Sequence, residues 1–343
     1  MIHGVINIYK ERGFTSHDVV GKLRGILRQK KIGHTGTLDP DAEGVLPVCL
    51  GKATKLCDLL TDKEKTYRAV LLLGKTTDTQ DVSGTVLSEV PVTAEEEKVR
   101  EAILSFVGDY DQIPPMYSAL KVNGQKLCDL ARAGKEVERK PRRVTIREIR
   151  IEKIDLPRVT MEVTCSKGTY IRTLCQDIGE NLGCGGCMES LLRTRVERFS
   201  LEDAIKLGEV EAIKAEKGLD GLMEKILPID GMFPDALKAV VPEDGMKALV
   251  NGNSLKENQI RPERAAADNE RVRVYDEAGR FYALYRYEAA EKQYRLEKMF
   301  YDREEEQDGI HTGAGRMWAG SGIKFVCSYK LTMRYEKSID KPG

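Results

Sequence analysis

The strongest candidate for chemistry in this sequence is one carboxylate, that of Asp39, in the stretch GHTGTLDPDAEGVLPVCLGKAT (residues 33–54). Pro40 follows it and pushes the backbone of Asp39 away from the helical region. The glycines around it permit tight turns and close approach by another molecule. These features predict a carboxylate on a rigid loop in front of a buried strand, a placement that suits a catalytic group. An ordinary Asp-Pro turn has the same local pattern, so the loop alone leaves both interpretations open.

Motifs for other kinds of chemistry are incomplete in this chain. A phosphate-binding P-loop would need glycine at position 46, where Leu46 stands. The segment DTQDVSG (78–84) lacks the carboxylate spacing of a calcium loop. Cys184 and Cys187 have CxxC spacing without a second pair, which is only a weak indication of zinc or redox use. If Asp39 reacts, it therefore acts as an organic nucleophile or base, without a metal or cofactor.

The composition is that of an ordinary globular protein. The chain has 343 residues, of which 41% are hydrophobic and 32% charged, enough for a large core and two domains. No apolar run approaches the ~20 residues of a membrane span, and the first residues contain no signal-like apolar block. The eight cysteines follow no disulfide framework, so we expect reduced thiols and a cytoplasmic location.

Positive charge is concentrated in two stretches, although the net charge is zero. Residues 22–31 carry five Lys or Arg and no acid, and residues 135–150 carry seven against three Glu. Such stretches suit a face that meets nucleic-acid phosphates. Two solvated surfaces would have the same composition, so charge alone does not decide between them.

The elements that must position Asp39 can be predicted from hydrophobic spacing. Strands are expected at 4–10, 45–50, 65–75, 159–165 and 189–200, and helices at 16–30, 53–60, 94–108 and 170–183. Ser16 is the expected N-cap of the first helix. Strands and helices do not alternate strictly, which predicts an α+β domain with a largely antiparallel or mixed sheet.

The order of these elements suggests an insertion and a second domain. The Pro pair after residue 109 predicts irregular structure, and with the basic stretch it indicates an insertion at about 109–145. A turn-rich boundary at 228–240 precedes short alternating segments at 238–302, which predict a small β-rich domain. Residues 303–343 are acidic and then Gly-rich, and we expect a disordered tail there.

Four long blocks of the sequence resemble, in the expected order, the TruB-type tRNA pseudouridine synthases, bacterial enzymes that act on uridine 55 in the T-arm. The blocks are GHTGTLDPDAEGVLPVCLGKATK, KTYRAVLLLGKTTDTQDVSG, QIPPMYSALKVNGQKL and CSKGTYIRTLCQDIGENLGCGG. The resemblance covers most of residues 1–230, which would be the catalytic domain. It implies a pseudouridine-synthase-like sheet with flanking helices, and it implies that residues 238–302 form a PUA-like domain.

The resemblance also implies a role for three residues in the reaction. Asp39 would be the nucleophile when uracil is detached from its ribose, turned and rejoined through carbon. Arg172 would pair with Asp39 and keep its carboxylate ionised. Tyr67 would stack on the flipped uracil and take part in proton transfer at C5. No cofactor or metal is required. Without the resemblance, Arg172 would be interpreted as a surface arginine and Tyr67 as a core residue.

Further residues would bind the substrate on the same grounds. Tyr170 and Leu191 would line the base pocket, and His34 would contact the RNA. Lys55 and Lys121 are candidates for phosphate contacts. Each of the five also has an ordinary interpretation as a core, turn or solvated side chain. The partner would be the T-arm of tRNA, with no membrane and no obligate protein partner, and we expect a monomer.

Two other functions remain open from the sequence. One is an RNA-binding protein that has this scaffold and performs no chemistry. The other is a synthase with a different RNA target, since related enzymes that use guide RNAs share the catalytic block. A variant with Asp39 replaced by Asn separates the first from an enzyme, because it should bind RNA and leave uridine unchanged.

Overall fold

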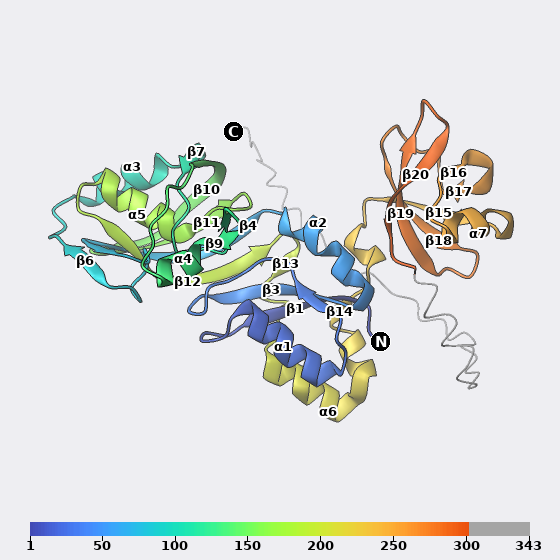
Figure 1. Ribbon diagram of the computed structural model, residues 1–343, viewed down its shortest axis with the longest axis horizontal. Helices are drawn as coiled ribbons and strands as arrows, with labels where there is room; N and C mark the ends of the chain where they lie inside the picture. The colour runs from blue at the N-terminus through green and yellow to red at the C-terminus, as the bar shows by residue number, and fades with distance from the viewer. Residues whose placement is uncertain (302–343) are drawn as a thin grey trace, which may run out of the picture. The chain divides into compact units, whose positions relative to one another are not determined.

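The computed structural model describes residues 1–301, which contain a ten-stranded sheet, a six-stranded sheet and two short hairpins (Figure 1). The order of the large sheet is β14 (Ile226–Leu227), β1 (Gly4–Lys10), β3 (Glu43–Leu50), β12 (Gly186–Val196), β4 (Lys65–Leu73), β11 (Arg158–Cys165), β10 (Arg142–Asp155) and β7 (Gly108–Gln112), with β2 (Ile32–His34) on β3 and β13 (Phe199–Ser200) on β12. Its pairs are antiparallel except β3 with β12. The expected mixed, largely antiparallel α+β fold is confirmed.

Strand β3, which follows Asp39, is buried on both faces. Leu46 and Val48 face a core formed with α1 (Ser16–Leu27) and α6 (Leu207–Met223), two helices that lie side by side in Figure 1. Val45 and Cys49 alternate with them and face the core that includes η1 (Gly51–Leu56) and α2 (Cys57–Thr61). Two-sided burial explains why this strand is a nearly continuous apolar run.

The N-terminus of α1 differs from the prediction by one residue. Thr15, not Ser16, is the N-cap: its hydroxyl accepts from the backbone N–H of Asp18, and the Asp18 carboxylate accepts from the N–H of Thr15. This reciprocal pair is a capping box. The helix ends at Leu27, earlier than expected, because Arg28 has a left-handed backbone (φ 53°).

The other end of the large sheet is covered by α3 (Glu96–Leu104) and α5 (Ile171–Asn181). Their apolar sides pack on β4, β10 and β11. Along β4, Tyr67, Ala69 and Leu71 are buried on one face, which confirms the alternation predicted for this strand. Helix α5 is the expected helix at 170–183, shortened at both ends.

The expected insertion at about 109–145 overlaps the large sheet at both ends. Its two ends are β7 and the start of β10, which pair antiparallel at the edge of the large sheet. Residues 113–141 lie between them and contain β8 (Lys121–Val122), β9 (Gln125–Lys126) and α4 (Leu127–Arg132). The Pro pair has no regular structure, as expected. The local sequence pattern could not predict this pairing, because β7 and β10 are far apart in the chain.

The six-stranded sheet has its own core and confirms the β-rich C-terminal region. Its order is β16 (Leu255–Lys256), β20 (Gln293–Met299), β19 (Phe281–Glu288), β18 (Arg271–Asp276), β15 (Leu237–Val241) and β17 (Arg261–Pro262), with α7 (Glu243–Val250) and η3 (Glu257–Gln259) beside them, while η2 (Asp230–Met232) precedes the sheet. The tail expected at 303–343 lies outside the described residues.

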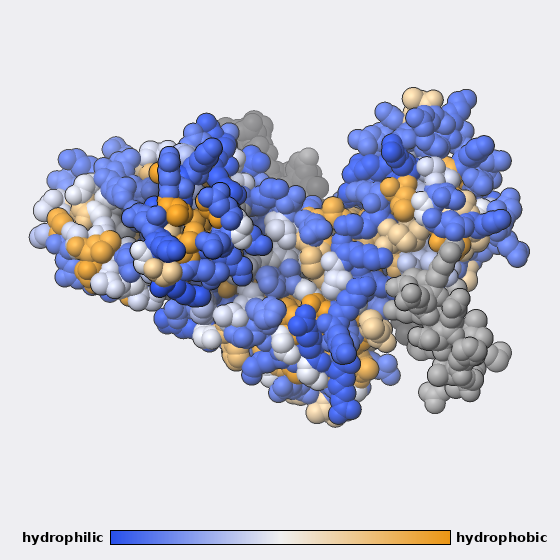
Figure 2. All heavy atoms as spheres, viewed as in Figure 1, coloured by the Kyte–Doolittle hydropathy of each residue, from blue (hydrophilic) through white to orange (hydrophobic). Residues whose placement is uncertain are grey.

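The surface in Figure 2 is mainly hydrophilic, with apolar residues gathered near β6 (Val86–Glu89), which pairs with β5 (Lys75–Thr77). Val86 and Leu87 are exposed there. Among residues 1–301, no helix is both long enough and apolar enough to cross a membrane.

Candidate active site

The loop that carries Asp39 connects β2 to β3 and is held by side chains from two other elements. The Leu38 N–H donates to the Ser16 hydroxyl (2.9 Å), and the Lys10 ammonium donates to the Pro40 carbonyl (3.0 Å). The loop closes on itself through Ala42, whose N–H donates to the Asp39 carbonyl (3.1 Å). Asp39 therefore projects from a backbone that is anchored on both sides, as the sequence predicted.

Arg172, in the first turn of α5, forms the expected ion pair with Asp39, with 3.1 Å between Nε and Oδ2. The rest of its guanidinium is also bound. Nη1 donates to the Thr79 carbonyl (3.0 Å) and lies 3.6 Å from Asp81, and Nη2 donates to the Tyr117 carbonyl (2.8 Å). The Arg172 side chain is only 6% exposed, whereas that of Asp39 is 43% exposed. A fixed arginine thus orients a carboxylate that solvent can reach.

Burial and the neighbouring charges act in opposite directions on the pKa of Asp39. Burial raises the pKa of Asp39 above its usual value, Arg172 lowers it, and nearby Asp81 raises it again. The net direction is upward, so Arg172 opposes the desolvation of Asp39 without overcoming it. Arg172 therefore favours the ionised form of Asp39 and also orients its carboxylate.

Tyr67 and Leu191 lie on neighbouring strands, β4 and β12. Tyr67 is 7% exposed and belongs to the same core as Leu38, the residue before Asp39. Leu191 is partly buried against that core. Burial is the main cause of the raised pKa of Tyr67, and the nearby guanidinium of Arg193 lowers it in part. Tyr67 is thus both a core residue and a neighbour of the Asp39 loop.

Tyr170 is the N-cap residue of α5 and lies two residues before Arg172. The buried side chain of Gln112 fixes its backbone: the Tyr170 N–H donates to Gln112 Oε1 (2.8 Å), and Gln112 Nε2 donates to the Tyr170 carbonyl (3.0 Å). Burial is the main cause of the raised pKa of Tyr170, and Asp39 contributes. Two hydrogen bonds from Gln112 therefore attach the start of α5 to β7.

His34 ends β2 and is partly buried at the start of the Asp39 loop. Its Nδ1 accepts from the Gly36 N–H (3.3 Å). Burial, followed by the charge of Arg193, lowers the pKa of His34. The imidazole is therefore neutral near neutral pH, able to accept and donate hydrogen bonds.

The two lysines expected to contact phosphates have different surroundings. The Lys55 ammonium donates to the Met299 carbonyl (2.8 Å), and the Lys298 ammonium donates to the Lys55 carbonyl (2.6 Å), so Lys55 joins η1 to β20. Lys121 is exposed on β8 within residues 113–141. Only Lys121 therefore presents an exposed side chain.

Sequence reasoning missed several residues that build the site: Lys10, Ser16, Asp81, Gln112 and Arg193. They share one property, a buried or half-buried polar group bonded to a partner far away in the chain. For Lys10 and Arg193, the alternation of their strands places the side chain on a buried face, and this could have identified them from the sequence. A charged residue on the apolar face of a strand requires polar partners.

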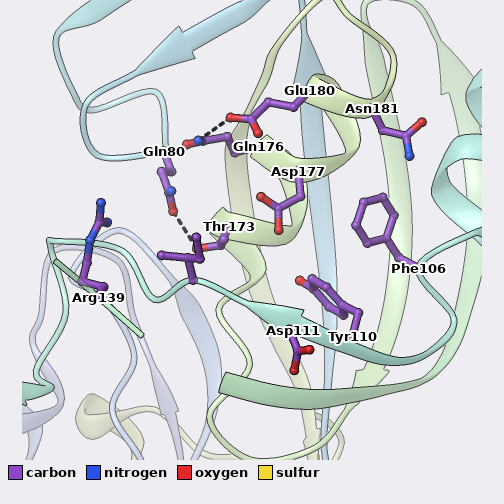
Figure 3. Close-up of a pocket in the computed structure, with 11 residues that line it drawn as sticks. Gln80, Phe106, Tyr110, Asp111, Arg139, Thr173, Gln176, Asp177, Glu180 and Asn181 are labelled. Atoms are coloured by element: carbon purple, nitrogen blue, oxygen red, sulfur yellow. Dashed lines mark hydrogen bonds between the residues drawn. The ribbon is translucent and has the colours of Figure 1, made fainter. Parts of the chain in front are cut away.

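A pocket of about 620 Å³ lies beside α5, and none of these residues lines it (Figure 3). It is lined by Gln80, Phe106, Tyr110, Asp111, Ile113, Arg139, Thr173, Gln176, Asp177, Glu180 and Asn181. In Figure 3, Asp177 lies between α5 and the ring of Tyr110. The pocket contains neither Asp39 nor Tyr67. Within residues 1–301, no group of His, Cys, Asp or Glu side chains is arranged to hold a metal ion.

The comparisons with known proteins agree with this geometry. The model of the TruB family pseudouridylate synthase (N-terminal domain) matches residues 24–171, and that of the tRNA pseudouridylate synthase B C-terminal domain matches residues 172–233. This chain belongs to the TruB family of pseudouridylate synthases. It is therefore an enzyme of the isomerase class.

Individual relatives extend the likeness over most of the chain. The tRNA pseudouridine synthase B of Lachnoclostridium phytofermentans is 53% identical over 87% of this chain and 100% of its own length. That of Alkaliphilus oremlandii is 50% identical over 76% of this chain and 85% of its own length. Among solved structures, an H/ACA ribonucleoprotein bound to a substrate RNA matches with a TM-score of 0.65 and 26% identity, over 88% of this chain and 86% of that one.

Proposed function

We propose that this TruB family protein converts uridine 55 in the T-arm of tRNA to pseudouridine, with Asp39 as the nucleophile. The observation that carries the proposal is the ion pair between a partly exposed carboxylate and a buried arginine whose guanidinium is also bonded to two carbonyls. That arrangement holds one reactive oxygen in a fixed direction toward solvent, where a substrate can reach it. Relatives named tRNA pseudouridine synthase B support tRNA as the substrate.

The reaction breaks the bond between uracil N1 and ribose C1′ and forms a bond between C5 and C1′; C5 loses its proton and N1 gains one, so that the product is an isomer of uridine. An ionised Asp39 can attack C1′, attack uracil C6 or assist elimination at the sugar, and each route begins with the same free carboxylate. Tyr67 would stack on the uracil and take part in the proton transfer. Leu191 and Tyr170 would complete the base pocket. No step requires a cofactor.

Access to Asp39 requires the target uridine to leave its stack. Extruding a base costs a few kcal/mol, which stacking and backbone contacts can recover. His34, at the entrance of the Asp39 loop, would help to hold the base outside the RNA. Lys121 and the basic stretch that leads into β10 would contact phosphates, so residues 113–141 would act as the RNA clamp.

The test uses purified protein alone with an unmodified tRNA transcript, no added metal or cofactor, and position-by-position mapping of pseudouridine. We expect product at uridine 55 with the natural protein and none with D39N. The matched control is D41N, because Asp41 is exposed two residues further along and its ion pair within residues 1–301 is with exposed Arg12. D41N should keep the activity.

Each other outcome has a clear meaning. Product with D39N would reject Asp39 as the nucleophile. Product at a different uridine, or only with an added guide RNA or protein, would reject the proposed target and the expectation that the monomer acts alone. A folded natural protein that binds tRNA and makes no product would favour the binding-only function.

A further inference from the structure

Arg193 is the largest side chain that is completely buried among residues 1–301, with 1% exposed. None of the ion pairs found within these residues includes it, and no carboxylate contributes to its pKa, which burial lowers. Burying a charge without a counter-ion is costly unless fixed polar groups surround it. The partners of Arg193 therefore indicate what the charge is used for.

Three of those partners are carbonyl groups on either side of Asp39. Nε donates to the Val45 carbonyl (2.7 Å), Nη2 to that of Gly36 (3.4 Å) and Nη1 to that of Thr37 (3.5 Å). The guanidinium thus joins the beginning of the Asp39 loop to the strand at its end. A rigid planar fork with five donors can make such a set of bonds, which a lysine cannot.

The backbone around Arg193 is adapted to this close approach. Arg193 is opposite Gly44 in the parallel pair of β12 and β3. A Cβ atom on Gly44 would lie 2.3 Å from the Arg193 carbonyl oxygen, and Gly44 has a φ of +105°. Only glycine therefore lets β12 come near enough for the guanidinium to reach the loop.

The fourth partner is the Tyr67 hydroxyl. Strand β12 lies between β3 and β4, and Arg193 is directly opposite Tyr67 in the antiparallel pair with β4. The Arg193 guanidinium and the Tyr67 hydroxyl are close enough for each to shift the pKa of the other. One buried guanidinium therefore holds the loop of the proposed nucleophile and lies beside the proposed stacking residue.

We propose that Arg193 is a positioning residue for pseudouridine formation: it fixes the distance between Asp39 and Tyr67, so that a flipped uracil meets both at once. The inference rests on the proposed roles of those two residues. Displacement of a catalytic group by about 1 Å can cost on the order of 100-fold in rate. Loss of the fork should therefore slow the chemical step and leave RNA affinity nearly unchanged, because Arg193 is buried away from phosphates.

The test compares R193K, which retains the charge, and R193Q, which removes it, in single-turnover reactions at saturating tRNA transcript. The matched control is R195Q, since Arg195 is exposed two residues further along the same strand. We expect the rate to fall about 10-fold for R193K and about 100-fold for R193Q, with the tRNA Kd changed by less than about threefold and R195Q keeping the natural rate. Circular dichroism at the assay temperature establishes the folded fraction.

A double-mutant cycle with Y67F distinguishes positioning from general stability. If Arg193 acts partly through the Tyr67 hydroxyl, R193K should slow the reaction less in the Y67F background than in the natural one. The inference is overturned if folded R193K has the natural rate, if its effect is the same in both backgrounds, or if neither Arg193 variant folds, because arginine would then serve stability alone. Absence of product with the natural protein would instead reject the proposed function.

Discussion

Asp39 and Arg172 form the pair on which the chemistry depends, and their charges lead to a prediction about pH. The reactive form of Asp39 is ionised, and burial raises its pKa. As pH decreases, protonation of Asp39 should therefore slow the reaction. This loss should begin at a higher pH than it would for an exposed aspartate, whose pKa is about 3.9. R172Q removes the influence that lowers this pKa, so the acid limb of the single-turnover rate should move to still higher pH.

The control for this shift is the same pH series with R195Q, which changes a charge on an exposed part of β12. An acid limb at the same pH in R172Q and in the natural protein would mean that Arg172 does not affect the ionisation of Asp39. The rate of R172Q at its plateau then reports how much orientation alone contributes.

Asp177, in the pocket beside α5, gives a prediction about stability. Burial, and then the charge of Glu180, raise the pKa of Asp177 to about 6. Because the folded protein then binds a proton more tightly than the unfolded chain, this group destabilises the fold increasingly as pH rises from about 4 to 6. D177N should raise Tm by about 2 °C near neutral pH and have little effect below about pH 4. Equal Tm differences at both pH values would contradict the assignment.

Single residues show what the sequence could and could not predict about the site. Asp39 and Arg172 belong to motifs that can be found locally, and the structure pairs them. Arg193 and Lys10 could not be assigned a role in this way, because their partners are backbone carbonyls of a loop remote in sequence. Any residue type can supply a carbonyl, so sequence alone does not reveal such contacts.

At the scale of elements, the N-terminus of α1 separates stability from activity at adjacent residues. T15A removes the helix cap and should cost about 1 kcal/mol of unfolding free energy, with activity retained. S16A removes the acceptor of the buried Leu38 N–H, which costs about 1–3 kcal/mol and loosens the loop of Asp39. S16A should therefore also lower the single-turnover rate.

Thermal unfolding and single-turnover assays on both variants check this difference. A folded S16A with the natural rate would show that the bond from Ser16 to the loop does not position Asp39. The comparison is controlled within itself, because the two hydroxyl residues are neighbours on the same helix end.

Strands with one buried face were predicted best. Strands that are defined by pairing with a segment far away in the sequence were predicted worst. The alternation of β4 and β11 identified both strands and their buried faces. The edge pair of β7 and β10 was not predicted. Strand β7 (GDYDQ) is mostly polar, so it has no apolar alternation and can be recognised as a strand only from its pairing with β10. Tertiary hydrogen bonds, rather than local preference, establish such an edge strand.

At the scale of the whole molecule, the basic surface around β10 is more neutral than its sequence suggests. Arg143 pairs with Asp111 (3.0 Å), and Arg147 pairs with Glu64 (2.7 Å). Arg142 is exposed and is in none of the ion pairs found within residues 1–301. We therefore expect Arg142, more than Arg143, to contact RNA phosphates.

The measurement is the salt dependence of tRNA binding. R142Q should weaken binding and reduce the slope of log K against log salt by about one. The control is D111N/R143Q, which removes a neutral pair and should leave the slope nearly unchanged. The same slope for R142Q and the natural protein would show that Arg142 does not contact RNA phosphates.

The parallel pair of β3 and β12 has a consequence for the order in which the site can form during synthesis. Residues 43 and 44 pair with residues 192 and 193, about 150 positions later in the chain. Contacts of such long sequence separation form slowly, since much chain must be ordered first. A ribosome that has released only β1 to β11 has therefore made the carboxylate and the tyrosine without the arginine that joins them. We expect the nascent enzyme to remain inactive until β12 has left the exit tunnel and inserted between strands that are already made.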